Sequence, residues 1–268
     1  MEEQQFFEQH LASFNPQQQA AVTAVDGPVL LLAVPGSGKT TVLVTRLGYM
    51  VQCRGIPPES ILTMTYTVAA TREMRNRFAA RFGAALADRM QFRTINGVSA
   101  KVLQYYSYRY NRQQPELMTN EGELTRMLTW LYQQVSDDYP TESTLKELRT
   151  AITYIKNMAL DEEGIAALET DLPDLPRLYR SYQAELKRQG WMDYDDQMVF
   201  ALQILRAVPA VLAHFQDQYR YLCVDESQDT PRSSTRSLPC WPGVPAICSW
   251  WGTRTRASTA SGRPIPRR

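Results

Sequence analysis

The sequence predicts an α/β protein in which a parallel β-sheet is interrupted by an all-helical insertion and followed by an irregular C-terminal tail. Three observations lead to this prediction. Apolar strands and amphipathic helices alternate through residues 1–104, and the alternation resumes in residues 190–230. Between them, residues 105–189 show only the apolar spacing of helices. Residues 231–268 show neither helical nor strand spacing, so we expect nothing there that could continue a parallel sheet.

The composition is that of an ordinary globular protein. Of the 268 residues, 44% are hydrophobic and 21% are charged, and the formal net charge is +1. The seven arginines after Pro231 leave residues 1–230 with 22 basic and 28 acidic side chains, so this part is acidic and the tail is basic. A contact with nucleic acid must therefore come from a local groove and not from bulk charge.

The cysteines, histidines and N-terminus narrow the class of protein. Four cysteines, at positions 53, 223, 240 and 248, lack the spacing of a metal site or disulfide framework, which favours a reduced, cytoplasmic protein. With only two histidines, His10 and His214, a histidine-based metal site or catalytic triad is disfavoured. The acidic N-terminus is unlike a signal or transit peptide, and no run of about 18 apolar residues predicts a membrane span.

The first predicted helix follows Asn15-Pro16, with asparagine at the cap and proline in the first turn. Three glutamines at positions 17–19 place their amides just ahead of a glycine-rich loop. A glutamine amide offers a donor and an acceptor together, so one of them can read the hydrogen-bonding edges of adenine. The alternative is a solvated helix face.

Six consecutive apolar residues, Val29 to Val34, predict a central strand that is covered on both faces of the sheet. The strand opens directly into a loop in which Gly36 and Gly38 let successive backbone N–H groups point into one concavity. A helix beginning near Lys39 adds its positive N-terminal end. Lys39 can reach the β- and γ-phosphates of a nucleotide, and the Thr40 hydroxyl can bind Mg²⁺. The alternative is a glycine turn followed by an unrelated lysine.

The remaining elements continue the pattern. Strands are predicted at 61–65, 92–95 and 219–224. Helices are predicted at 39–53, 67–84, 99–106, 121–135, 143–158, 161–169, 175–188 and 195–206.

An acidic pair, Asp225-Glu226, ends the strand at 219–224. Asp225 can hold Mg²⁺ from the side opposite Thr40, and Glu226 can orient and deprotonate the water that attacks the γ-phosphate. The alternative is a solvated acidic turn. Because the pair follows a buried strand in a chain that also carries a phosphate loop, the functional interpretation is favoured.

These motifs resemble those of the UvrD/Rep-like DNA helicases of superfamily 1. FNPQQQAAV (14–22) is similar to the Q motif, AVPGSGKT (33–40) to Walker A with the alanine usual in this family, and ILTMTYTVAATREMRNR (61–77) to motif Ia. VDESQDT (224–230) is similar to motif II, and MDYDDQM (192–198) to the segment that returns from subdomain 1B to subdomain 1A. The motifs cover residues 11–103 and 190–230, and the helices between these two stretches resemble the family by position only.

The resemblance implies a RecA-like subdomain 1A (1–104 and 190–230) with helical subdomain 1B (105–189) inserted. It also implies ATP and Mg²⁺ as cofactors, and translocation 3′→5′ along single-stranded or partly duplex DNA. The implied nucleotide contacts are Gln18, Val34, Pro35, Gly36, Ser37, Gly38, Lys39, Thr40 and Thr41. Thr40 and Asp225 would bind the metal, Glu226, Lys39 and Gln228 would serve catalysis, and Thr65, Tyr66, Thr67, Thr94 and Asn96 would contact DNA.

Two departures fall on the implied DNA path. Val68-Ala69 replace the usual Asn-Lys of motif Ia, and Asn96 replaces the histidine of the T-F-H motif. Tyr66 keeps an aromatic ring where the family stacks a base, a contact worth about 1–3 kcal/mol. A core aromatic at the end of a strand is the alternative for Tyr66.

The segment after Thr230 does not continue the family pattern. With permitted codons, the register that starts at the third base of the Arg232 codon can encode GDEDQSIYGFRAA, which resembles motif III at the right distance after motif II. We therefore hypothesise a frameshift near residues 230–232, so that this chain lacks motifs III to VI and is a non-autonomous helicase fragment. Two other classes stay open: an inactive DNA- or partner-binding remnant, and another P-loop NTPase such as a small-molecule kinase.

Overall fold

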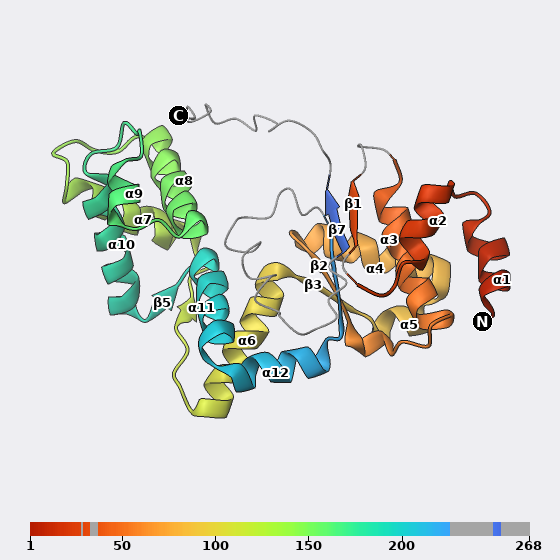
Figure 1. Cartoon of the computed structure of the whole chain (residues 1–268). Coiled ribbons are helices and arrows are strands. Elements are labelled where there is room, and N and C mark those ends of the chain that lie inside the picture. The colour runs from red at the N-terminus through yellow and green to blue at the C-terminus, as the bar shows by residue number, and fades with distance from the viewer. Residues whose placement is uncertain (28, 33–36, 226–248, 253–268) are drawn as a thin grey trace. The chain divides into compact units, whose positions relative to one another are not determined.

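The computed structural model describes residues 1–27, 29–32, 37–225 and 249–252, which form two compact units. The first holds the described residues of 1–98, 205–225 and 249–252, and the second holds residues 99–204. The chain passes from one unit to the other within helices α6 (Ile95–Tyr110) and α11 (Tyr194–Ala207) (Figure 1). The helical insertion expected at residues 105–189 falls within the second unit, whose two boundaries lie inside these long helices.

The first unit contains a parallel sheet and its helices. Its strands are β1 (Leu30–Leu32), β2 (Ile61–Thr65), β3 (Gln91–Thr94), β6 (Tyr221–Val224) and β7 (Ser249–Gly252). Its helices are α1 (Glu3–Phe6), the π-helix η1 (Phe7–Leu11), α2 (Pro16–Thr23), α3 (Lys39–Gln52), the 3-10 helix η2 (Pro58–Ser60), α4 (Val68–Phe82), α5 (Ala84–Arg89) and α12 (Pro209–Gln218).

The five strands pair in the order β1-β7-β6-β2-β3, and every pairing is parallel. Among the described strands β1 therefore lies at an edge, whereas the sequence predicted a central strand. The apolar run at 29–34 indicates that both faces of the strand are covered, but it carries no information on the neighbours in the hydrogen-bonding direction. The expected strand also extends into residues 33–34, which lie outside the described residues.

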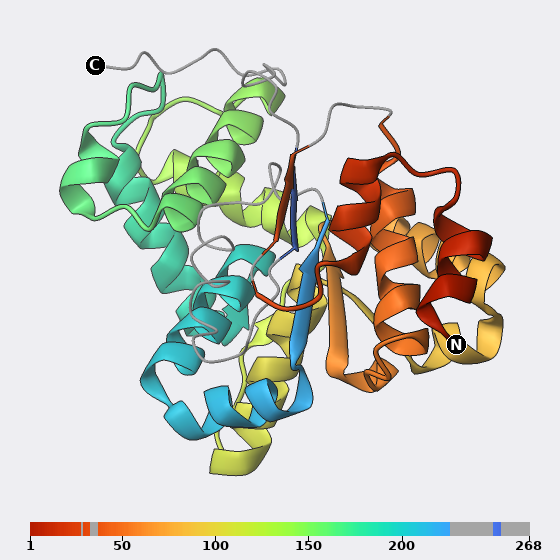
Figure 2. The ribbon, with the colours of Figure 1, turned by 45° about the vertical axis from the view of Figure 1, so that its right-hand side comes forward.

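Strand β7 differs from the expectation that no residue after Thr230 would extend the sheet. It pairs with β1 through Leu31↔Trp251 and with β6 through Val224↔Trp250. Ser249-Trp250-Trp251-Gly252 is too short to show a period, but aromatic residues favour strands. Figure 2 shows β7 between β1 and β6.

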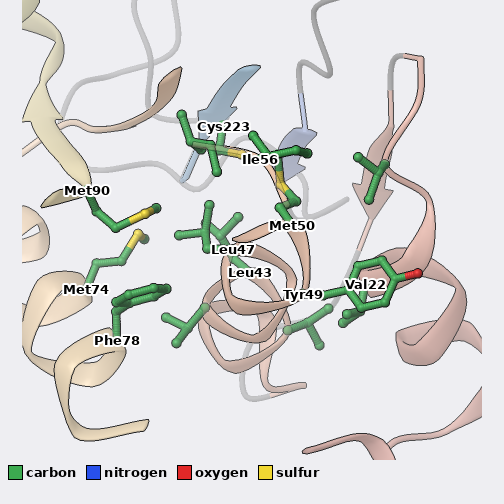
Figure 3. Close-up of a cluster of buried hydrophobic side chains, with 14 of the residues drawn as sticks. Val22, Leu43, Leu47, Tyr49, Met50, Ile56, Met74, Phe78, Met90 and Cys223 are labelled. Carbon is green, nitrogen blue, oxygen red and sulfur yellow. The ribbon is translucent and has the colours of Figure 1, made fainter. Parts of the chain in front are cut away.

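Helices α2, α3 and α4 lie together on one side of the sheet in both views (Figures 1 and 2). Helix α3 contacts α2 and α4, and α4 contacts β2 and β3. The core between them is built from fully buried side chains such as Leu43, Leu47 and Phe78 (Figure 3). Gly48 of α3 faces α4 so closely that a Cβ atom there would lie 2.1 Å from Cζ of Phe82.

Most local predictions are confirmed. Strand β2 has the predicted bounds, α3 begins at Lys39, and α2 begins at Pro16 with Asn15 as its cap. Helix α6 begins four residues earlier than predicted, because Thr94 accepts a hydrogen bond from the Gly97 amide and starts the helix directly at the end of β3. In the described residues no single helix is long and apolar enough to cross a membrane; only α11 and α12 taken together reach that length.

The second unit is helical apart from one short strand pair. Its remaining elements are α7 (Glu121–Gln133), α8 (Glu142–Met158), α9 (Glu162–Ala166), α10 (Leu175–Gln189) and the paired strands β4 (Glu116–Leu117) and β5 (Trp191–Met192). Buried residues from α7, α8 and α10, among them Leu128, Ile152 and Leu178, form its core. The unit therefore has a hydrophobic core of its own, as the apolar spacing of three and four predicts.

A charged cluster is buried beside this core. The Lys156 ammonium, 2% exposed, lies 2.5 Å from Asp193 Oδ2 and 2.8 Å from Asp196 Oδ1. The Tyr182 hydroxyl donates to Asp193 at 2.7 Å, and its ring lies 4.9 Å from Lys156 Nζ. Burial, followed by the charge of Asp193, raises the pKa of the Asp196 carboxyl. The cluster ties α8 and α10 to the start of α11.

Candidate functional site

The candidate anion site is the N-terminus of helix α3. Gly38, directly before the helix, has a left-handed backbone with φ of 79°, which glycine adopts without strain. Among the described residues no side chain caps this end of α3, and the first N–H groups of a helix have no partner within the helix itself. In the described part of the chain the Ser37 Oγ atom is also buried without a hydrogen-bond partner. An anion at this place would receive hydrogen bonds for which the described part of the chain shows no side-chain partner.

Gln18 connects helix α2 to this loop. The Asn15 side chain accepts from the Gln18 amide at 2.9 Å, and Gln18 Oε1 accepts from the Asn15 amide at 3.1 Å, which completes a capping box. Gln18 Nε2 also donates to the Ser37 carbonyl at 3.2 Å. The neighbouring Gln19 turns away and donates to the carbonyls of Leu11 and Phe14. Of the three glutamines at 17–19, Gln18 is thus the one that joins the cap of α2 to the loop before α3.

Arg46 is a functional candidate that the sequence reasoning missed. It is fully buried in α3, and its Nη1 atom donates to the Ala21 carbonyl of α2 at 2.6 Å. Its Nε and Nη2 atoms have no hydrogen-bond partner among the described residues, and burial lowers the pKa of the guanidinium. The available signal was a charged residue between Leu43 and Leu47 on the apolar face of the helix. Arg46 fixes α2 to α3, and hence Gln18 to Lys39.

Asp225, Thr65 and Thr94 end up at one edge of the sheet. Asp225 follows β6, is 7% exposed, and donates its amide to the Met64 carbonyl of β2. Thr65 at the end of β2 is in register with Thr94 at the end of β3. Helix α3 follows β1 at the same carboxyl edge, since all strands are parallel. Among the described strands, β7 alone lies between β1 and β6, so these two strands are about 10 Å apart.

The residues expected to contact DNA differ in accessibility. The Thr65 side chain is buried and its hydroxyl is 2.5 Å from the Thr71 hydroxyl, so Thr65 holds the start of α4. Thr67 caps α4 by accepting from the Ala70 amide. Tyr66, between them, is 50% exposed, which is incompatible with the alternative of a core aromatic. Thr94 and Asn96 are half-buried.

Five of the predicted site residues lie outside the described residues. These are Val34, Pro35 and Gly36 of the loop, and Glu226 and Gln228 after β6. Lys39, Thr40 and Thr41 form the first turn of α3, where Lys39 and Thr40 are half-buried and Thr41 is exposed.

A nucleotide with its metal ion fits the donor set. The uncapped helix end, the left-handed glycine and the buried Ser37 hydroxyl suit a phosphate group. Thr40 carries a hydroxyl and Asp225 a carboxylate, and both groups belong to the class of hard oxygen ligands that Mg²⁺ prefers.

Comparison with known proteins adds independent information. Residues 14–238 match the family model of the UvrD/REP helicase N-terminal domain. The chain is 33% identical to the ATP-dependent DNA helicase PcrA of Leuconostoc citreum over 225 residues, which is 81% of this chain and 29% of that protein. It is 31% identical to UvrD1 of Mycobacterium leprae over 226 residues and 29% identical to PcrA of Bacillus subtilis over 227 residues. These stretches cover 82% and 84% of this chain, but 29% and 30% of the two relatives.

Proposed function

Because the chain belongs to the UvrD/REP helicase family, by a match over residues 14–238, we propose that it is the ATP-binding part of an ATP-dependent DNA helicase. The proposal is carried by the arrangement at the N-terminus of α3. There Gly38, the buried Ser37 hydroxyl and the uncapped helix offer an anion site, and Gln18 is hydrogen-bonded to the same loop. The chain spans less than a third of the length of the helicases that it matches. The complete activity is therefore proposed for a longer protein of which this chain corresponds to one part.

Each residue of the site has a distinct task in this proposal. The first N–H groups of α3 and the Lys39 ammonium bind the phosphates, and the Gln18 amide contacts the adenine while it holds the Ser37 carbonyl. Thr40 and Asp225 hold Mg²⁺, which when bound neutralises charge that develops on the transferred phosphoryl group. Glu226 orients and deprotonates the attacking water, and Gln228 follows it on the same segment.

The carboxyl edge of β2 and β3 is the proposed DNA side of the same unit. Tyr66 presents an exposed ring on which an unpaired base can stack, and Thr67 and Thr94 flank it with backbone and hydroxyl groups. Val68 is 67% exposed where the family pattern has asparagine, so one polar contact to the strand is replaced by an apolar one. Hydrolysis of ATP would drive movement 3′→5′ along the single strand in the complete, RecA-like helicase.

Nucleotide binding with and without magnesium tests the site. A fluorescent ATP analogue is titrated into the 268-residue chain and into the Lys39→Ala and Asp225→Asn variants, with either Mg²⁺ or a chelator present. Lys39→Ala should abolish binding in both conditions, because it removes the charge that neutralises the phosphates. Asp225→Asn should bind as the unaltered chain does in the chelator and lose only the increase that Mg²⁺ provides.

The matched control is Lys187→Ala, which removes an exposed lysine from α10 in the other unit and should leave both titrations unchanged. An Asp225→Asn variant whose affinity responds to Mg²⁺ as strongly as the unaltered chain would refute the shared metal site. Equal losses in Lys39→Ala and Lys187→Ala would refute the anion site.

A further inference from the structure

The turn that joins β2 to α4 holds Tyr66 between two threonines that are bonded within the chain (Figure 1). Thr65 is the last residue of β2 and is 2% exposed. Thr67 caps α4 by accepting from the Ala70 amide at 3.1 Å. Tyr66, between them, is 50% exposed. The backbone is therefore held on both sides of a ring that is itself open to solvent.

Thr71, one turn into α4, closes this arrangement. Its hydroxyl lies 2.5 Å from the Thr65 hydroxyl, and the two hydroxyls lie 3.0 and 3.1 Å from the Thr67 carbonyl. The Thr71 amide also donates to that carbonyl, at 3.0 Å. Each hydroxyl has one hydrogen, so one hydroxyl donates to the carbonyl while the other donates to its neighbour. In either arrangement the hydroxyls link the end of β2 to the start of α4, across the residue that carries the ring.

The helix itself does not require the Thr71 hydroxyl. Thr67 already caps α4, and threonine has a lower helix propensity than alanine at a helical position. What the hydroxyl adds is a fixed geometry for Thr65 and Thr67, which are the two neighbours of Tyr66 in the chain. A ring whose backbone is fixed before a base arrives loses less conformational entropy when the base stacks on it.

We propose that Thr71 is a positioning residue for the DNA contact: together with Thr65 it holds the backbone of Tyr66, so that the ring is set for stacking before a base binds. Neither threonine touches the strand in this arrangement. The sequence predicts a DNA contact for Thr65, but a side chain so deeply buried favours a role behind the turn. The inference rests on the proposed DNA side at the ends of β2 and β3, and Thr71 is a residue to which the sequence motifs assign no role.

Binding of a fluorescent oligothymidylate, measured by anisotropy without nucleotide on the 268-residue chain, tests the proposal. Thr71→Val removes the hydroxyl but keeps the branched shape of the side chain, and it should weaken binding about two- to tenfold, the equivalent of one hydrogen bond. Thr71→Ser keeps the hydroxyl and should bind as the unaltered chain does. The slope of log K against log salt should stay the same in both variants, because no phosphate contact is lost.

A double-mutant cycle with Tyr66 separates positioning of the ring from a loss of stability. Tyr66→Ala should weaken binding about fivefold or more, since it removes the stacking ring. In the Tyr66→Ala background, Thr71→Val should change the affinity by less than about twofold, because no ring remains to be positioned. General damage to the fold would instead lower the affinity equally in both backgrounds.

Thr150→Val is the matched control, because the Thr150 hydroxyl also donates to a carbonyl four residues earlier, that of Lys146 at 2.9 Å, in α8 of the other unit. It should leave the affinity unchanged. A Thr71→Val variant that binds as tightly as the unaltered chain, or that loses as much affinity without Tyr66 as with it, would overturn the positioning role and leave the DNA side standing. Unchanged binding by Tyr66→Ala, or no binding by the unaltered chain, would overturn both.

Discussion

The Gln18 side-chain amide donates from Nε2 to the Ser37 carbonyl at 3.2 Å, and thereby joins the cap of α2 to the loop in front of α3. Its Oε1 atom accepts from the Asn15 amide at 3.1 Å. An amide nitrogen has two hydrogens and its oxygen has two lone pairs, so Gln18 can hold the loop and contact a base at the same time. If Gln18 contacts adenine as proposed, it links recognition of the base to the conformation of the loop before α3.

The Gln18→Ala substitution should therefore weaken the binding of ATP more than the binding of inorganic triphosphate. Loss of the loop contact affects both ligands, but loss of the base contact affects ATP alone. We expect ATP affinity to fall about five- to thirtyfold, the equivalent of one to two hydrogen bonds, and triphosphate affinity to fall less. Competition of both ligands against a fluorescent nucleotide measures the two factors. Gln17→Ala, at an exposed position of the same helix, is the control. An equal loss of affinity for the two ligands would show that Gln18 does not contact adenine.

Gly48→Ala should destabilise the strand-containing unit by about 1–3 kcal/mol, the usual cost of overpacking. The added Cβ would lie 2.1 Å from Cζ of Phe82, and the Phe82 ring is held between His10 and Phe78 at 5.0 and 5.1 Å. The helix propensity gained by alanine, about 0.5–1 kcal/mol, is too small to offset this. Urea unfolding of Gly48→Ala in the native and Phe82→Leu backgrounds checks the cause. The substitution should cost less where the ring is absent, and an equal cost would place the strain elsewhere.

Lys156→Met should destabilise the helical unit by about 3–5 kcal/mol at neutral pH, because two buried carboxylates lose their cation. The loss should depend on pH. Without the ammonium the pKa of Asp196, already raised by burial, rises further in the folded chain. The folded chain then binds more protons than the unfolded chain, so its stability falls as pH rises above the unfolded pKa of about 3.9.

Unfolding midpoints of Lys156→Met at pH 4 and pH 7.5 measure this difference, with the exposed Lys187→Met as the control that should change stability by less than about 0.5 kcal/mol. A Lys156→Met variant that loses the same stability at both pH values would show that lost packing, and not lost charge, sets the cost.

The features that could be predicted from the sequence are those encoded by a few neighbouring residues. The cap at Asn15, the start of α3 at Lys39 and the bounds of β2 are encoded within a few residues, and the structure confirms them. The order of the strands depends on contacts between distant segments, so the edge position of β1 and the insertion of β7 left no local pattern. Arg46 and Lys156 were missed for a related reason: a charged residue within an apolar helix signals burial, but its partner lies elsewhere in the chain.

The isolated chain should bind ATP without vigorous turnover. The family resemblance implies that a second RecA-like subdomain supplies an arginine to the transition state, and such an arginine contributes about 10³–10⁵ in rate in related NTPases. The chain spans less than a third of the relatives that it matches. Steady-state ATP hydrolysis with and without single-stranded DNA tests this, and strong stimulation by DNA would refute the view of the chain as a non-autonomous part.

The gene should encode motif III in a shifted frame after Thr230. The alternative register predicts the segment NLFMV, with four consecutive apolar residues, directly before GDEDQSIYGFRAA, and NLFMV corresponds to residues 246–251 of the present chain. The structure has β7 at Ser249–Gly252, between β1 and β6, so a strand at this distance from β6 can enter the sheet at that position. The four apolar residues LFMV would suit a covered strand better than Ser-Trp-Trp-Gly does. The nucleotide sequence decides the matter: codons from Arg232 onward that cannot encode this segment, or a second frame closed by an early stop, would exclude the frameshift.

If the second frame is open, a chain made with the restored frame should have a more stable strand-containing unit than the present chain, as measured by its free energy of unfolding. Equal stability would mean that Ser-Trp-Trp-Gly serves the sheet as well as the predicted strand.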